Sequence, residues 1–435
     1  MKSAAESLTA ALRLAVEVRG EEVRALIFLY FFCLLCSYYI LRPLRDEMGV
    51  ASGVENLQWL FTGTFFAMLA AVPVFGWAVA RFSKRRLVPL VYHVFAANIL
   101  LFFLLLQSEA ATVHVARAFF IWVSLFNLFV ISVFWSFMAD LFRNEQGRRL
   151  FPFIAAGGSL GALLGPSLTA VLAVPLGPIN LLLFSALFLE LAVFCVGRLL
   201  RAPALAPPLD PTARADAGVA FQGEEVIGGG ILNGIRLVVR SPYLLGICLY
   251  ILLFTTTSTF LYFQQAHIVA AAFDDSAERT RIFAIIDLVV ALLTILVQCA
   301  VAGRLITRFG VGLAVAFLPF LTALGFAALA LAPTLAMLIA FKSLRRAANF
   351  AISKPAREIL FTVVSPEEKY KSKNFIDTVV YRGGDSASGW AFAGLKGIGL
   401  DLPAIAVLTV PLAVFWLFVG LLLGRRQEAM AAQRA

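Results

Sequence analysis

The chain has 435 residues, of which 61% are hydrophobic and 14% are charged. Soluble globular proteins have about 45–50% apolar and about 25% charged residues, so the composition excludes a water-soluble protein, and the aromatic content of 13% excludes a disordered chain. The formal net charge of +10 would suit a nucleic-acid partner, but most of the cations lie in short loops between apolar runs, and we expect no nucleic-acid binding.

The apolar runs predict an all-α, polytopic membrane protein. A membrane-crossing helix needs roughly 20 mostly apolar residues, and the bilayer leaves backbone groups no partner outside their own segment, which favours helices. In chain order the predicted spans are 25–41, 57–80, 87–106, 115–139, 150–174, 179–196, 243–263, 282–302, 311–332, 334–352, 375–398 and 402–423. The sequence therefore predicts twelve transmembrane helices.

The positions of Lys and Arg predict that both termini are cytoplasmic, because cytoplasmic loops are enriched in these residues. With this orientation the outward loops contain four cations: Arg42, Arg45, Arg279 and Arg281. Residues 1–24 lack the pattern of a cleaved signal peptide. We therefore expect a multi-pass protein of the inner (cytoplasmic) membrane, in contact with the lipid bilayer and monomeric.

A long polar segment, residues 198–242, separates the first six predicted spans from the last six. It contains APALAPPLDP and GEEVIGGG, which is the composition of a linker. The predicted parts are a cytoplasmic segment 1–24, a six-helix bundle 25–197, the linker 198–242, a second six-helix bundle 243–424 and a cytoplasmic tail 425–435. Two parallel repeats of this kind bind substrate at their interface.

Two short matches support an internal repeat, and one of them pairs Gly157-Gly158 with Gly383-Gly384. In the other match, GWAVARF lies at the end of the second span and GRLITRF follows the eighth, so that a glycine, an arginine and a phenylalanine recur at one constant spacing. This G-x-x-x-x-R-F pattern resembles the loop signature of the major facilitator superfamily. The resemblance implies a fold of two six-helix bundles and a transport function.

The tenth predicted span, 334–352, carries several ionisable residues. An ionisable side chain at this depth is costly and indicates a functional site. If the helix starts at Thr334, Lys342 lies about 12 Å and Arg346 about 18 Å along it. The spacing places four residues on one helical face: Lys342, Arg345, Arg346 and Asn349.

Cations outnumber acids within the predicted spans. The acids at mid-membrane depth are Glu190, Asp287 and Asp385. The surplus of cations favours an anionic substrate, since arginine binds carboxylate and phosphate through two charge-assisted bonds. We predict that the substrate-binding residues are Arg45, Lys342, Arg345, Arg346, Asn349 and Arg382.

The first predicted span ends in YYILRPLRDEMG, where we expect Pro43 to break the helix. Arg42 and Arg45 then lie at the outer mouth, as part of an anion site or as interfacial anchors. The motif GGSLG fits the G-x-S-x-G pattern of hydrolases, but the elbow also needs a preceding strand, a His base and an acid. We expect no enzyme activity, no cofactor and no metal site.

Three segments resemble the ATP/ADP translocase family of nucleotide-exchange carriers. They are LRPLRDEMGV, FWSFMADLFRNEQGRRLFPFIAAGG and LRRAANFAISKPAREILFTVVSPEEKYKSKNFIDTVVYRGGDS. The first contributes Arg42, Arg45 and Asp46, the second Asp140 and Arg149, and the third Arg346, Glu358 and Arg382 to positions that match the family. We interpret six residues as gating or charge-pair residues: Arg42, Asp46, Asp140, Arg149, Glu358 and Asp385.

The leading hypothesis is an alternating-access transporter of an anionic, phosphorylated metabolite, with nucleotide exchange implied by the resemblance. The alternative is a proton-coupled major-facilitator transporter of a small organic anion or drug-like molecule. In that case Glu190 or Asp287 would carry the proton, because apolar surroundings favour the neutral carboxyl. A third hypothesis is a membrane scaffold or sensor that does not transport.

Overall fold

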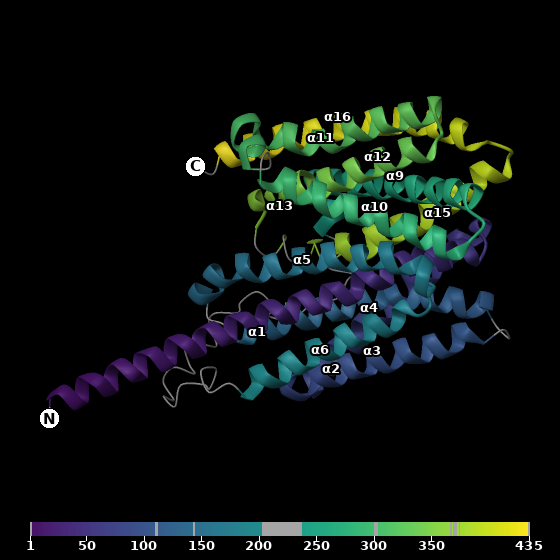
Figure 1. Ribbon diagram of the computed structural model, residues 1–435. Helices are drawn as coiled ribbons and strands as arrows, with labels where there is room; N and C mark the ends of the chain where they lie inside the picture. The colour runs from purple at the N-terminus through teal and green to yellow at the C-terminus, as the bar shows by residue number, and fades with distance from the viewer. Residues whose placement is uncertain are drawn as a thin grey trace. The chain divides into compact units, whose positions relative to one another are not determined.

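The computed structural model describes residues 2–108, 112–141, 144–201, 237–299, 303–365, 368, 372–373 and 375–433. These residues form helices and no strands. Ten of the described helices are long and apolar enough to cross a membrane. The predicted all-α, polytopic architecture is therefore confirmed (Figure 1).

In the first half of the chain, the described residues form six long helices and one short 3-10 helix. Their bounds are α1 (Lys2–Ala51), η1 (Val54–Asn56), α2 (Leu57–Arg81), α3 (Lys84–Gln107), α4 (Thr112–Leu141), α5 (Asn144–Leu176) and α6 (Leu181–Arg201). The second half adds α9 (Pro242–Ala272), α10 (Ser276–Val297), α11 (Gly303–Leu331), α12 (Leu335–Ala348), η4 (Asn349–Ser353), α13 (Lys354–Leu360), η5 (Phe361–Val363), η6 (Ile376–Val380), α15 (Tyr381–Gly397) and α16 (Leu402–Ala432).

The tenth and eleventh predicted spans are not among the ten long apolar helices. The tenth corresponds to α12 and η4, after which the helix continues as α13, and the eleventh corresponds to η6 and α15. Both contain several charged residues, and in both a π-helix, η4 or η6, interrupts the regular α-helix. Single π-helical turns inside α-helices are frequent at functional sites. The charged residues and the π-helical turns together make these two helices candidates for function.

The prediction that Pro43 breaks the first helix is wrong. α1 continues through Pro43 to Ala51. A proline removes one backbone hydrogen bond, and membrane helices tolerate it where neighbouring helices and polar side chains support the backbone. As a consequence Arg45, Asp46 and Glu47 belong to the helix rather than to a loop.

The chain divides into two compact units. Unit 1 comprises Met1–Leu44, Ala71–Val115 and Trp122–Glu225, and unit 2 comprises Arg45–Ala70, Ala116–Ile121 and Val226–Ala435. Helices α1, α2 and α4 each contribute residues to both units. The predicted boundaries of the two six-helix bundles remain a prediction.

In unit 1, glycines of α5 allow close packing against α1. A Cβ atom added at Gly157 would lie 2.6 Å from the carbonyl oxygen of Phe28, and one added at Gly161 would collide with the carbonyl oxygen of Phe32. Small residues at a spacing of four let two helices approach to backbone contact. The repeat of Gly157, Gly161 and Gly165 in the sequence is therefore a packing motif between α1 and α5.

Replacing Gly161 with Ala is expected to destabilise the protein by about 1–3 kcal/mol, because the added methyl group would meet backbone atoms that cannot move aside. Gly197 in α6 has nothing within 4 Å of an added Cβ and provides the matched control. Thermal unfolding of the purified variants measures the difference. Equal loss of stability in Gly161→Ala and Gly197→Ala would contradict the packing assignment.

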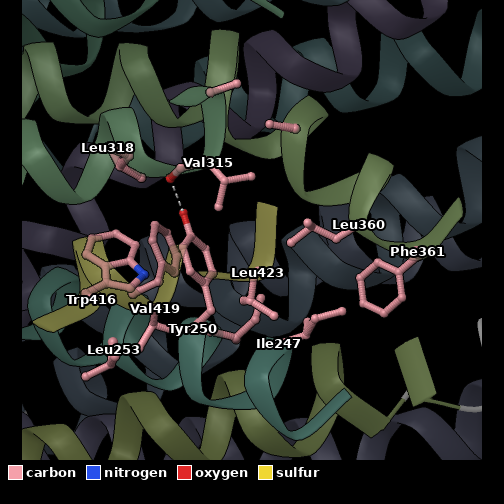
Figure 2. Close-up of a cluster of buried hydrophobic side chains, with 14 of the residues drawn as sticks. Ile247, Tyr250, Leu253, Val315, Leu318, Leu360, Phe361, Trp416, Val419 and Leu423 are labelled. Carbon is pink, nitrogen blue, oxygen red and sulfur yellow. Dashed lines mark hydrogen bonds between the residues drawn. The ribbon is translucent and has the colours of Figure 1, made fainter. Parts of the chain in front are cut away.

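One cluster of buried hydrophobic residues in unit 2 joins α9, α11 and α16 (Figure 2). The hydroxyl of Tyr250 donates a hydrogen bond to the carbonyl oxygen of Val315 (2.8 Å), and the ring of Trp416 packs beside it, fully buried. α11 and α16 run side by side, and a Cβ on Gly424 would collide with the backbone of Gly312. This tightly packed core fixes α9, one of the helices that carry the site described below.

Candidate functional site

The helix α12 carries most of the predicted binding residues. It begins after Thr334, whose hydroxyl accepts a hydrogen bond from a backbone N–H in the first turn and so caps the helix. Lys342 and Arg345 are 7% and 4% exposed, although they are cations. Asn349 is the first residue of the π-helix η4, and its backbone N–H still donates to the carbonyl oxygen of Arg345.

Arg346 forms a largely buried ion pair with Asp287 of α10. The distance from Nη1 of Arg346 to Oδ1 of Asp287 is 2.5 Å, and the side chains are 13% and 3% exposed. Lys342 precedes Arg346 by four residues and shares its helical face. The ammonium of Lys342 lies over the ring of Tyr262 in α9, 5.1 Å from its centroid. Two of the three predicted cations of α12 therefore face α9 and α10.

Arg345 has different surroundings. It donates from Nε to the hydroxyl of Thr322 (3.0 Å) and from Nη2 to the hydroxyls of Thr257 (3.0 Å) and Ser258 (2.9 Å). Its guanidinium also lies over the ring of Phe254 (5.4 Å). Within the described part of the chain these partners are all neutral, so Arg345 keeps an uncompensated positive charge in the interior of unit 2.

The C-terminal end of α1 contacts Tyr262, the residue that lies beneath Lys342. Arg45 pairs with Asp46 (2.7 Å), and the guanidinium of Arg45 lies 5.1 Å from the ring centroid of Phe120. The hydroxyl of Tyr262 donates to Oδ1 of Asp46 (3.0 Å). Tyr262 thus contacts Asp46 through its hydroxyl and Lys342 through its ring. Within unit 2 the predicted binding residues Arg45 and Lys342 are brought together by a tyrosine that the sequence analysis did not select.

A second ion pair at the end of α1 was also missed. Glu47 is fully buried and accepts two hydrogen bonds of 2.8 Å from Arg279, one from Nε and one from Nη2. Arg279 donates in addition to the carbonyl oxygens of Phe273 and Asp274. The acid went unnoticed because Pro43 was expected to end the helix, which would have placed Glu47 in a solvated loop. If the helix had been predicted to continue, an acid within it would have indicated a cationic partner.

In α15, Arg382 and Asp385 lie close to each other. Nη1 of Arg382 is 3.8 Å from Oδ2 of Asp385, and the hydroxyl of Thr259 in α9 donates to Oδ1 of Asp385 (3.2 Å). Thr259 directly follows Ser258, which binds Arg345. Consecutive residues of α9 therefore hold a cation of α12 and an acid of α15.

Other predicted gating residues lie elsewhere. Glu358 in α13 pairs with Lys373 (2.6 Å) and is half exposed. Arg42 lies over the ring of Tyr39 (5.9 Å) in unit 1. The side chains of Asp140 and Arg149 fall outside the described part of the structure.

Of the two predicted proton carriers, Glu190 belongs to unit 1 and Asp287 to unit 2. Glu190 in α6 pairs with His93 in α3 at 3.0 Å, and both side chains are exposed. Asp287 is buried and pairs with Arg346. Only Asp287 therefore lies in contact with a predicted substrate-binding residue.

Tyr262→Phe is expected to destabilise the protein by about 0.5–1.5 kcal/mol, because it removes the hydrogen bond to Asp46 and keeps the ring beneath Lys342. Tyr262→Leu removes both contacts and is expected to cost more. Thermal unfolding of the two purified variants measures the effect. If the Phe variant were as unstable as the Leu variant, the ring would contribute nothing to holding Lys342.

The chain is similar to several solved structures. It matches the POT family transporter PepTSo, solved in meso, with a TM-score of 0.64 and 14% identity over 94% of this chain and 98% of that chain. An auto-inhibited POT family peptide transporter matches with a TM-score of 0.62 and 15% identity over 92% and 96%. A POT family transporter in complex with 5-aminolevulinic acid matches with a TM-score of 0.63 and 12% identity over 94% and 96%. At these identities the similarity shows a shared fold.

Comparison with curated protein sequences gave no match. The motif resemblance to ATP/ADP translocases gains no support from these comparisons beyond the superfamily. The family model of the Major Facilitator Superfamily matches residues 26–369. The match covers most of the sequence and agrees with the fold, so the chain belongs to the Major Facilitator Superfamily and is a membrane transporter rather than an enzyme.

Proposed function

We propose that the chain is a proton-coupled, alternating-access carrier of a small organic anion. The observation that carries the proposal is the buried ion pair of Arg346 and Asp287, with Lys342 one helical turn away on the same face. One carboxylate and two cations thereby lie on neighbouring helices in the interior of unit 2, which is built from apolar helices. Such a group has both a proton acceptor and an anion-binding charge.

Protonation of Asp287 would remove the negative charge that compensates Arg346. A buried cation without a counter-charge is costly, so the site then favours an anion from outside. A carboxylate or phosphate group fits the guanidinium of Arg346 through two charge-assisted bonds. Proton binding and anion binding therefore strengthen each other by linkage. A carrier that changes conformation with both bound moves the proton and the anion in the same direction.

Two structural neighbours support an anionic ligand. One is a POT family transporter in complex with 5-aminolevulinic acid, and another is a peptide transporter POT in complex with sulfate. Both of these molecules carry an anionic group. The similarity in fold makes a comparable ligand class reasonable for this chain, and the buried cations of α12 supply matching charge.

Nucleotide or phosphate-ester exchange is the second candidate. It is favoured by Arg345, which has neutral partners in the described part of unit 2, since a substrate with more than one negative charge would compensate both Arg345 and Arg346. The three sequence motifs that resemble ATP/ADP translocases agree with this candidate. Exchange differs from proton coupling in needing substrate on both sides of the membrane.

A first experiment identifies the substrate. Purified protein is screened by thermal shift against carboxylates, amino acids, short peptides, phosphate esters and nucleotides, because a ligand that binds the folded state raises its unfolding temperature. The protein is then reconstituted into liposomes, and uptake of the labelled binder is measured with an acidic exterior and at equal pH. We expect faster uptake with the acidic exterior and loss of that difference with a protonophore.

Asp287→Asn separates the two candidates. In the proton-coupled carrier this variant loses the dependence on the pH gradient, whereas Glu190→Gln keeps it. In the exchanger, uptake depends on internal substrate and is the same with or without the gradient. Gradient-dependent uptake that is unchanged in Asp287→Asn would overturn the proposed function.

A further inference from the structure

A polar pair lies between α3 and α6 of unit 1. Nδ1 of His93 is 3.0 Å from Oε1 of Glu190. His93 is the ninth residue of the span Arg85–Gln107, and Glu190 is the tenth residue of the span Leu181–Arg201. At 1.5 Å per residue, the pair lies at least about 12 Å from either end of each helix. This distance places the pair within the hydrocarbon region of a bilayer about 30 Å thick.

The pair is exposed rather than buried. The side chains of His93 and Glu190 are 56% and 45% exposed. Exposed apolar side chains flank the pair on both helices, and Gly197 on α6 has nothing within 4 Å of an added Cβ. We call this surface the α3–α6 face; it comprises Leu90, His93, Val94, Leu187, Glu190 and Phe194.

Each side chain of the pair has one further polar atom that could form a hydrogen bond. Nε2 of His93 and Oε2 of Glu190 have no hydrogen-bond partner among the residues that the structure describes. Hydrocarbon offers no donor or acceptor, and an unsatisfied polar group there costs several kcal/mol. Ionisable residues in membrane helices face the interior of a bundle or a water-filled cavity in almost all cases. A face of this kind needs a partner that supplies one donor and one acceptor.

We propose that the α3–α6 face binds a second copy of the chain. The face carries one ring nitrogen and one carboxyl oxygen that are unused, so it is complementary to itself. A two-fold axis places His93 of one copy opposite Glu190 of the other, and the same contact then forms twice. The exposed leucine, valine and phenylalanine side chains pack around this four-membered polar group. The proposal replaces the expected monomer with a dimer and is independent of the transported substrate.

Crosslinking in native membranes tests the position of the interface. In a Cys299→Ser background, which removes the exposed cysteine, Val94→Cys introduces a reactive group on the α3–α6 face. Leu324→Cys on α11 is the matched control, since Leu324 and Val94 are 53% and 50% exposed. With a bis-maleimide we expect covalent dimers of Val94→Cys only. Equal crosslinking of both variants, or crosslinking of Val94→Cys to a different protein, would overturn the proposal.

Subunit counting tests the role of the polar pair. Labelled protein is diluted into liposomes, and photobleaching steps are counted for the wild type, for H93L/E190L and for the exchanged variant H93E/E190H. We expect two steps for the wild type and the exchanged variant, and one step for H93L/E190L, whose folding is checked by thermal unfolding. A single step in the wild type, or two steps in H93L/E190L, would show that the pair does not join two copies.

Discussion

Asp287→Asn is expected to destabilise the protein by about 3–5 kcal/mol, because it leaves the charged, largely buried Arg346 without its ionised partner. Arg346→Gln is expected to have an effect in the same direction, since it leaves Asp287 without its guanidinium. The double variant D287N/R346Q has no uncompensated charge at this position and should recover most of the loss. Unfolding of the wild type and the three variants by denaturant, followed as a double-mutant cycle, gives the coupling free energy of the pair.

The pair of Arg198 and Glu22 supplies the control for this cycle. Its nitrogen and oxygen atoms are 3.2 Å apart, but both side chains are 54% exposed. An exposed pair contributes at most about 1 kcal/mol, so Arg198→Gln should leave stability nearly unchanged. Additive effects of Asp287→Asn and Arg346→Gln would mean that the two residues do not stabilise each other.

Arg279→Ala is also expected to cost about 3–5 kcal/mol, because Glu47 would remain fully buried without the two hydrogen bonds it now accepts. Arg279→Lys keeps the charge but cannot reproduce the planar two-bond geometry, so it should recover only part of the stability. Thermal unfolding of the purified variants in detergent provides the measurement.

Arg281→Ala is the control for this second prediction. Arg281 lies 3.7 Å from Glu278 on the same helix, and its side chain is 48% exposed, so its loss should change stability by less than about 1 kcal/mol. A loss of similar size in Arg279→Ala and Arg281→Ala would show that the burial of Glu47 is not the source of the effect.

The sequence predicted the helical architecture well because apolar length alone determines it. It also identified the cations of α12, since charges within an otherwise apolar segment stand out. Their partners were harder to predict. Thr257, Ser258 and Thr322 bind Arg345 through hydroxyl groups that scarcely change the apolar character of their helices.

Two further features could not be predicted for physical reasons. The pairing of Glu47 with Arg279 depends on α1 remaining helical beyond Pro43, which is decided by packing rather than by local preference. The pairing of His93 with Glu190 depends on α3 and α6 being neighbours, and span prediction gives the length of each helix but not its neighbours. In both cases the missing information was how the helices pack against one another in the folded protein.

The π-helix η4 changes the direction in which the side chains after it point around the helix axis. A π-turn holds one residue more than a regular turn, and each residue of an α-helix advances about 100° around the axis. The residues after Ser353 are therefore rotated by about that angle relative to the phase set by α12. If η4 became regular α-helix, Arg357, which now lies over Phe254 at 4.8 Å, would swing away while Arg346 kept its place. The five residues of η4 thus set the faces that the segments before and after it present to their neighbours.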